Sequence, residues 1–115
     1  MKKKVVAFDL DGILAESEPA LTWERDPPVA FYTFYQASVP NAENIELLNR
    51  LQATKKYKIV IYTARVENFR EVTEAWLKKH EVRYDCLVMS KMYFDALLDD
   101  RSASTKEGLL KLLGD

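Results

Sequence analysis

The stretch "KVVAFDLDGIL", residues 4–14, begins as an apolar strand and ends in two carboxylates. Residues 5–8 are all apolar, Asp9 and Asp11 then bracket Leu10, and Gly12 lets the chain turn. An apolar run without polar alternation is typical of a strand that is covered on both faces of a parallel sheet. Reactive groups in such sheets gather at the carboxyl ends of the strands. Asp9 and Asp11 are therefore the first candidates for functional residues.

Three more apolar runs predict strands, and the segments between them have helical patterns. The strands are expected at "YKIVIYT" (57–63), "CLVMS" (86–90) and "FDALLD" (94–99), and the helices at 41–53, 66–80 and 104–115. Asn41 is expected to start the first of these helices, and Ser104 with Glu107 forms a capping-box pattern in the last. Strands that alternate with helices predict an α/β domain of three layers, with a central parallel sheet and helices on both faces.

Composition limits the classes of function. The 115 residues suit a single domain over 1–115, and 48% of them are hydrophobic and 30% charged. A net charge of −1 disfavours a general nucleic-acid or membrane binder, so nucleic acid is an unfavoured partner that charge alone does not exclude. Cys86 is the only cysteine, which fits a reducing, cytoplasmic location. No run approaches the ~20 apolar residues of a membrane span, so no membrane association is expected.

Polar residues follow each predicted strand, and together they suit phosphoryl transfer. They are Asp9, Asp11, Thr63, Lys91, Asp99 and Asp100. An ionised carboxylate can attack phosphorus without a base, but it repels an anionic phosphate. A Mg²⁺ ion held by several carboxylates removes that repulsion, while a lysine and a hydroxyl hold the remaining phosphate oxygens. Lys106 is the alternative to Lys91 for this last role.

These residues carry a resemblance to a known family. "FDLDGIL" resembles the first motif of the haloacid dehalogenase (HAD) superfamily, "IVIYTAR" the second, Lys91 the third and "ALLDDRS" the acidic fourth. The four motifs occur in the family's order over residues 4–101. The resemblance implies a Rossmann-like HAD fold, with the strands in the order 4-1-2-3, and a Mg²⁺-dependent phosphatase that passes through an aspartyl-phosphate.

The resemblance also implies roles for single residues. Asp9 is the nucleophile and a metal ligand, and Asp11 is the general acid/base, whose backbone carbonyl also binds metal. Thr63 and Lys91 hold the phosphoryl group. Asp99 and Asp100 complete the metal site, and which of the two contacts the metal directly stays open. Ile13 stands where the family most often has threonine, which removes a hydroxyl but no catalytic group.

The region between the first and second motifs bears on the substrate. It must hold one helix and one strand, which leaves too little chain for a helical cap domain. We therefore expect an open site that accepts large substrates or is closed by a partner subunit in a homo-oligomer. Residues 15–40, with the aromatic "FYTFY", are expected to fold partly over the site as a flap, and packing of its rings is slightly favoured over a substrate-facing lid. Arg65 and Arg101 flank motifs, where they contact substrate or form surface ion pairs.

Within the superfamily, the second half of the chain is similar to small phosphatases of capsular polysaccharide biosynthesis, which implies a sugar phosphate or related small phosphate as substrate. A weaker similarity, in "WLKKHEVRYDCLVM", is to the phosphatase half of polynucleotide kinase/phosphatases, so a polynucleotide 3′-phosphatase is the alternative. A response-regulator receiver is disfavoured, because the middle strand here ends in Thr63 and not in an aspartate. A catalytically weak HAD-fold interaction module remains the third hypothesis.

Overall fold

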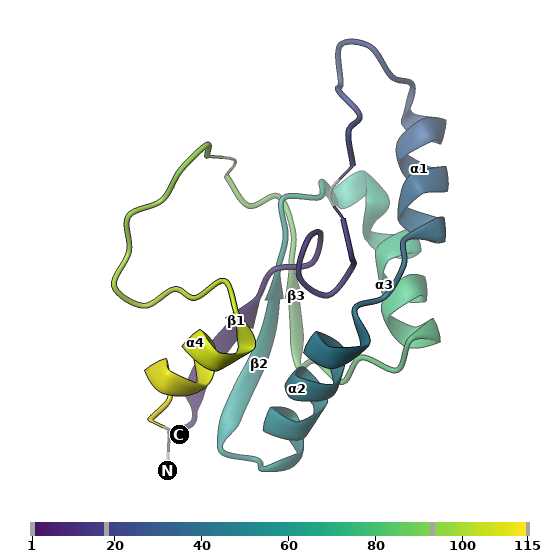
Figure 1. The fold of residues 1–115 in the computed structure, drawn as a ribbon. Helices are drawn as coiled ribbons and strands as arrows, with labels where there is room; N and C mark the ends of the chain where they lie inside the picture. The colour runs from purple at the N-terminus through teal and green to yellow at the C-terminus, as the bar shows by residue number, and fades with distance from the viewer. Residues whose placement is uncertain (1, 18, 93, 115) are drawn as a thin grey trace.

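The computed structural model describes residues 2–17, 19–92 and 94–114 of the chain. In chain order the elements are β1 (Lys4–Phe8), α1 (Pro28–Ala37), α2 (Ala42–Ala53), β2 (Tyr57–Tyr62), the 3-10 helix η1 (Glu67–Phe69), α3 (Arg70–Lys79), β3 (Cys86–Val88) and α4 (Lys106–Leu112) (Figure 1). None of the helices in these ranges has the length and apolar character that crossing a bilayer requires.

The sheet is parallel and has the strand order β1-β2-β3. Phe8 pairs with Ile61, and Ile61 pairs with Leu87, so the three strands end at the same edge. Parallel strands joined by helices place the residues that follow each strand side by side. The 1-2-3 part of the predicted order is therefore confirmed, and residues 9–11, 63–65 and 89–91 meet at one edge.

The fourth strand, predicted at 94–99, does not form. Residues 89–105 run from β3 to α4 as a long connection without strand or helix in its described part, and it lies away from the sheet (Figure 1). Its apolar core is only Ala96, Leu97 and Leu98, flanked by Asp95 and Asp99, and alanine and aspartate are depleted in strands. β1 is consequently an edge strand among the described residues, not the central strand that the order 4-1-2-3 requires.

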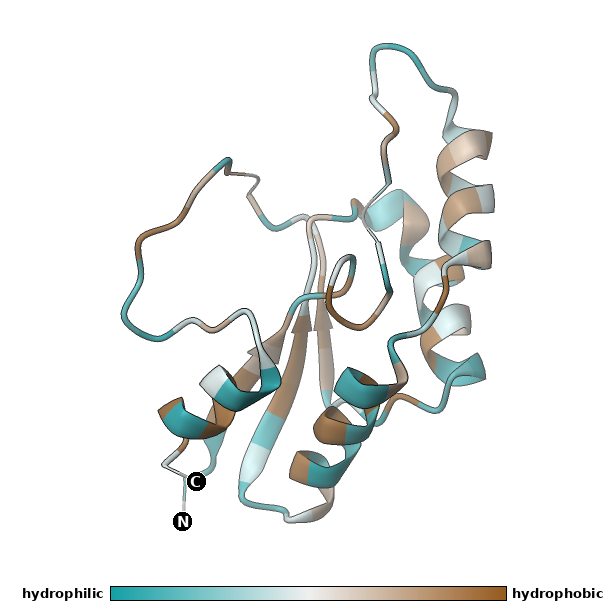
Figure 2. Ribbon diagram, viewed as in Figure 1, coloured by the Kyte–Doolittle hydropathy of each residue, from teal (hydrophilic) through white to brown (hydrophobic). Residues whose placement is uncertain are grey.

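Only one face of the sheet is covered by the described part of the chain. The buried positions on the strands are Val6, Phe8, Ile59, Ile61 and Leu87, and the exposed ones are Lys4, Val5, Ala7, Lys58, Tyr62 and Val88. This alternation is that of a sheet with one packed face. The prediction of helices on both faces is therefore not met, because the connection after β3 extends outward where a second layer would lie. Figure 2 shows the hydrophobic residues of the strands and of this connection.

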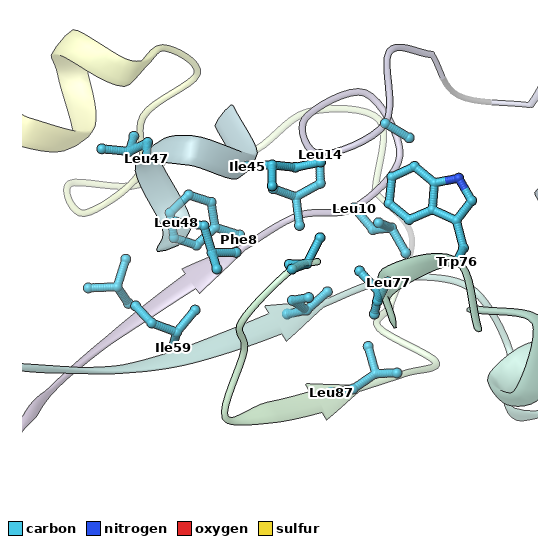
Figure 3. Close-up of a cluster of buried hydrophobic side chains, with 14 of the residues drawn as sticks. Phe8, Leu10, Leu14, Ile45, Leu47, Leu48, Ile59, Trp76, Leu77 and Leu87 are labelled. Atoms are coloured by element: carbon cyan, nitrogen blue, oxygen red, sulfur yellow. The ribbon is translucent and has the colours of Figure 1, made fainter. Parts of the chain in front are cut away.

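The loop after β1 is anchored in the core. Leu10 and Leu14 are fully buried and lie beside Phe8 and Ile45 (Figure 3). Gly12 has a φ of 87°, a left-handed conformation that favours glycine and lets the chain reverse between these two leucines. The backbone carbonyls of residues 13 and 14 accept hydrogen bonds from the start of α2, at 2.9 and 2.7 Å. Asp9 and Asp11 therefore project from a fixed turn.

The helix starts follow the sequence signals with one shift. The side chain of Asn41 accepts a hydrogen bond from the Asn44 backbone N–H at 3.0 Å, as expected for the start of α2. α4 is capped by Thr105 and not by Ser104, since the Thr105 hydroxyl accepts from the Gly108 N–H at 3.1 Å. The N-cap of α4 therefore lies one residue later than the capping-box pattern predicts.

The segment 15–40 is partly helical. Its α1 packs against α3, and the Trp76 indole N–H on α3 donates to the Ser38 carbonyl at the end of α1, at 2.8 Å. Figure 1 shows α1 beside α3, at the edge where the strands end. This segment, residues 15–40, is called the insertion below. Its helix α1 lies next to the edge of the sheet at which the strands end.

Candidate active site

Four of the predicted site residues lie around one cavity. Asp9, Asp11, Thr63 and Lys91 all line a hollow of about 430 Å³ at the carboxyl edge of the sheet. They reach it because each follows the end of one of the three parallel strands. The volume falls within the ~300–1,000 Å³ range of small-molecule sites. The sequence-based grouping of these four residues is thus realised in the structure.

Lys91 is held over Asp9. Its ammonium lies 3.6 Å from Asp9 Oδ2. The backbone fixes this placement, because the Lys91 N–H donates to the Thr63 carbonyl at 2.9 Å. The preceding Ser90 has a φ of 62° and donates its N–H to the Arg65 carbonyl at 2.8 Å. A phosphate oxygen placed between the lysine and Thr63 would therefore lie next to the Asp9 carboxylate.

Thr63 presents a hydroxyl from inside the sheet edge. Its side chain is buried, and Oγ1 accepts a hydrogen bond from the Arg65 backbone N–H at 3.2 Å. A hydroxyl group that accepts one hydrogen bond can donate its own proton to another acceptor. Thr63 is therefore suited to hold a phosphate oxygen without conformational change.

Arg65 forms the strongest polar contact of the site with Asp11. Its Nε and Nη2 donate to the two Asp11 carboxylate oxygens at 3.0 and 2.8 Å. Nη1 donates to the Thr73 hydroxyl at 2.9 Å, and the guanidinium carbon lies 3.8 Å from the centre of the Tyr35 ring. The Arg65 side chain is only 1% exposed. The interpretation of Arg65 as a surface ion pair is therefore wrong.

A positional signal for this pair exists in the sequence. Asp11 stands two residues after Asp9, and Arg65 stands two residues after Thr63, on loops that follow neighbouring parallel strands. Equal offsets after paired strands place residues close together in space. Burial also raises the pKa of Tyr35 above its usual value, and the nearby charge of Asp11 adds to this increase while Arg65 opposes it. Three ionisable groups from two loops and α1 thus share one environment.

The acidic pair of the fourth motif is not gathered with the other carboxylates. Asp99 borders a second hollow of about 320 Å³, which Asp9 and Lys91 also line. Its carboxylate accepts the Arg101 backbone N–H at 2.9 Å, a contact that lowers the pKa of Asp99. Asp100 is exposed and lies 3.6 Å from Arg101. Among residues 2–17, 19–92 and 94–114, no three acidic, histidine or cysteine side chains are grouped as a metal site.

The other two basic candidates also lie outside the cavity. Arg101 is exposed and contacts Asp100. Lys106, the alternative to Lys91, lies 3.8 Å from Glu43 at the start of α2. Lys91 is therefore the lysine that the structure brings to Asp9.

Aromatic side chains of the insertion form one wall of the cavity. Phe31 and Tyr35 on α1 are buried, and Trp23 stacks on Phe31 with ring centres 4.0 Å apart. All three line the same hollow as Asp9 and Asp11. The packing interpretation is confirmed for Phe31 and Tyr35, which are buried, while a substrate-facing role of the exposed Trp23 stays a prediction.

Comparisons with known proteins support the fold. No family model matches the sequence, and no curated protein matches it. A crystal structure of a target protein from Vibrio cholerae is similar over 96% of this chain and 97% of that one, with a TM-score of 0.70 and 22% identity. At that identity the likeness establishes the fold alone.

Two structures of the Pnkp1/Rnl/Hen1 RNA repair complex contain a chain that is also similar. Each has a TM-score of 0.54 and 28% identity, over 86% and 95% of this chain. This chain spans 31% of that larger chain in both structures. The α/β arrangement of this chain therefore recurs within a longer chain.

Proposed function

We propose that this protein is a phosphomonoester hydrolase of the HAD type, with Asp9 as nucleophile. The observation that carries the proposal is the gathering of Asp9, Asp11, Thr63 and Lys91 around one cavity at the strand ends. These are a nucleophile, an acid/base and two phosphate-binding groups, the minimum set for phosphoryl transfer to a carboxylate. The sequence resemblance to the family's motifs supports the same assignment.

The first half-reaction transfers the phosphoryl group to Asp9. A carboxylate oxygen of Asp9 forms a bond to phosphorus, and the bond between phosphorus and the ester oxygen breaks. Lys91 and the Thr63 hydroxyl hold the other phosphate oxygens, where negative charge is spread in the transition state. The departing oxygen takes a proton from Asp11 and leaves as an alcohol.

The second half-reaction returns the enzyme to its starting state. Water attacks phosphorus, Asp11 accepts the proton that the water loses, and the bond between phosphorus and Asp9 breaks to release inorganic phosphate. Both Asp11 oxygens accept hydrogen bonds from Arg65, which holds this carboxylate in place for the base role. Acting as an acid requires that one of those oxygens exchange its Arg65 contact for the proton. We therefore assign Arg65 as the residue that positions Asp11.

We further propose Mg²⁺ as the cofactor. The donor set fits the metal in its chemistry, because carboxylate and carbonyl oxygens are the ligands that Mg²⁺ prefers. Asp9 at the cavity would be one donor, and the resemblance adds the backbone carbonyl of Asp11 as a second. Asp99 or Asp100 would join them only if the connection after β3 moves inward. A bound Mg²⁺ would neutralise the charge of the phosphate.

Two substrate classes remain, and each has an observation in its favour. Two described cationic side chains line the cavity: Arg65, which is bonded to Asp11, and Lys91, which lies 3.6 Å from Asp9. So few cations suit one small phosphate ester such as a sugar phosphate. The similarity to a chain of an RNA repair complex favours a 3′-phosphorylated polynucleotide. The open cavity suits a large substrate, or a second subunit that would cover it.

The assignment of Asp9 is tested with Asp9→Asn. An amide is a poor nucleophile, so phosphate release from an aryl phosphate in the presence of Mg²⁺ should fall to the level without enzyme. Glu46→Gln is the matched control, because it neutralises an exposed carboxylate on α2 that is remote from the cavity. Turnover by Asp9→Asn at the rate of the control would refute the proposal.

A further inference from the structure

The cavity has a composite lining, with polar groups at its floor and aromatic rings along one wall. The floor carries Asp9, Thr63 and Lys91, and the wall carries Trp23, Phe31 and Tyr35. One molecule that fills the hollow would therefore meet both surfaces. A phosphate ester bound at the floor would extend its leaving group along the aromatic wall.

Trp23 differs from the other rings of the wall. Phe31, Tyr35 and Phe69 are buried, with centroid distances of 5.2–6.2 Å among them. Trp23 is 55% exposed although one face of its ring is stacked on Phe31, nearly parallel at 8°. A large exposed aromatic residue fixed on a buried cluster is a ready stacking surface for a second ring. The turn that carries it is itself fixed, because the Thr22 backbone N–H donates to Asp26 at 3.0 Å.

We propose that this site selects phosphomonoesters whose leaving group carries a planar aromatic ring, as a nucleotide does, and that Trp23 stacks on that ring. The proposal rests on the proposed phosphatase function and deepens it by naming the substrate class. A sugar phosphate without a base would leave the wall in contact with water. Stacking of a base on an aromatic side chain tolerates any base, because each base has a π face.

Two exposed side chains of the connection after β3 favour the same class of ligand. Met92 and Phe94, on the connection after β3, line the same hollow, and both are exposed. Thioether and aromatic groups make favourable contacts with ring edges and faces. A planar ring that stacks on Trp23 would therefore lie in a hollow that these two side chains also line.

The first experiment compares two ligands that differ only in the ring. Phosphate release from adenosine 5′-monophosphate and from ribose 5-phosphate is measured with Mg²⁺, and the binding of each is measured by calorimetry. Wild-type protein should prefer the nucleotide. Trp23→Ala should lower kcat/KM for the nucleotide by roughly 5- to 150-fold, the range of one stacked base, and leave ribose 5-phosphate almost unchanged. Trp23→Phe, which keeps a ring, should recover most of the loss.

Tyr32→Ala is the matched control. Tyr32 is an exposed aromatic residue of α1 that lines, with Trp23, a separate hollow that Asp9 does not line. An equal loss in Tyr32→Ala and Trp23→Ala would place the ring in that outer hollow and overturn the proposal. Equal kcat/KM for the two ligands in wild-type protein would also overturn it.

The binding measurements separate this proposal from the phosphatase function. If neither ligand releases phosphate, the proposed function fails, and a Trp23-dependent preference for the nucleotide in calorimetry still supports the stacking surface. If both ligands are hydrolysed with equal efficiency, the function stands and the stacking surface is refuted.

Discussion

Removal of Arg65 should destabilise the fold as well as the site. Arg65→Ala would leave the Asp11 carboxylate, whose side chain is 13% exposed, without its two hydrogen bonds. It would also leave the fully buried Thr73 hydroxyl without the Nη1 donor. An unpaired charge in a mostly buried position is the costly outcome of breaking such a pair.

The magnitude follows from the burial of the pair. Removing one partner of a buried ion pair costs about 3–5 kcal/mol, and the partial exposure of Asp11 places this pair at the lower end of that range. A loss of about 3 kcal/mol lowers the urea midpoint by roughly 1–3 M, for a slope of about 1–3 kcal/mol per molar urea. Arg65→Lys should recover only part, since a lysine cannot form the two parallel hydrogen bonds.

Urea unfolding is followed by tryptophan fluorescence, in which the buried Trp76, hydrogen-bonded to Ser38, reports the loss of packing and the exposed Trp23 also emits. Arg70→Ala is the matched control. Arg70 also makes two hydrogen bonds to one carboxylate, at 2.8 and 3.0 Å to Glu67, but on the exposed surface. The control should therefore unfold close to wild type. If Arg65→Ala and Arg70→Ala have the same urea midpoint, the burial argument is wrong.

Three more results are expected from the proposed chemistry. Excess EDTA should abolish phosphate release and added Mg²⁺ should restore it; full activity in the chelator would remove the metal from the proposal. Asp11→Asn should lower turnover by about 10²–10⁴-fold, the usual contribution of general acid/base catalysis, and mass spectrometry should detect a phosphate adduct on Asp9 because its hydrolysis lacks a base. Because burial raises the pKa of Tyr35, the folded state holds the phenolic proton more tightly than the unfolded state, so the free energy of unfolding should fall as pH rises above about 10. Tyr35→Phe should show a smaller fall in alkaline denaturation curves, and an unchanged curve would contradict the assigned cause.

Local patterns in the sequence predicted most of the sheet edge that forms the site. The strands at 4–8, 57–62 and 86–88 each had a clear apolar run, and the rule that parallel strands end at one edge brought Asp9, Thr63 and Lys91 together. Two backbone hydrogen bonds, which no sequence pattern reveals, complete the placement of Lys91. The sequence therefore predicts those site residues whose positions depend mainly on where the strands end.

The fourth strand, predicted at 94–99, was wrong because its formation depends on tertiary pairing. Residues 94–99 have an apolar centre, but a strand of alanine and leucine forms only where a neighbouring edge and a covering layer stabilise it. β1 offers an open edge, but the second face of the sheet is exposed among the described residues, so the covering layer is missing there. Asp99 and Asp100 therefore lie in a connection whose position the strand register does not fix. The burial of Arg65 was not predicted for a different reason. Charged residues are usually exposed, and only the ion pair with Asp11 explains why this one is buried.

Arg65 joins the insertion to the acid/base residue. Its guanidinium is bonded to Asp11 on one side and lies against the Tyr35 ring of α1 on the other, and that ring packs edge-on against Phe69 at 5.2 Å. A substitution that empties the position of Tyr35 would therefore disturb both the aromatic wall and the support of Asp11. Trp23 contacts the same cluster only from outside. It follows that Trp23 is the one ring of the wall whose removal can test recognition of a substrate without also changing the geometry of Asp11.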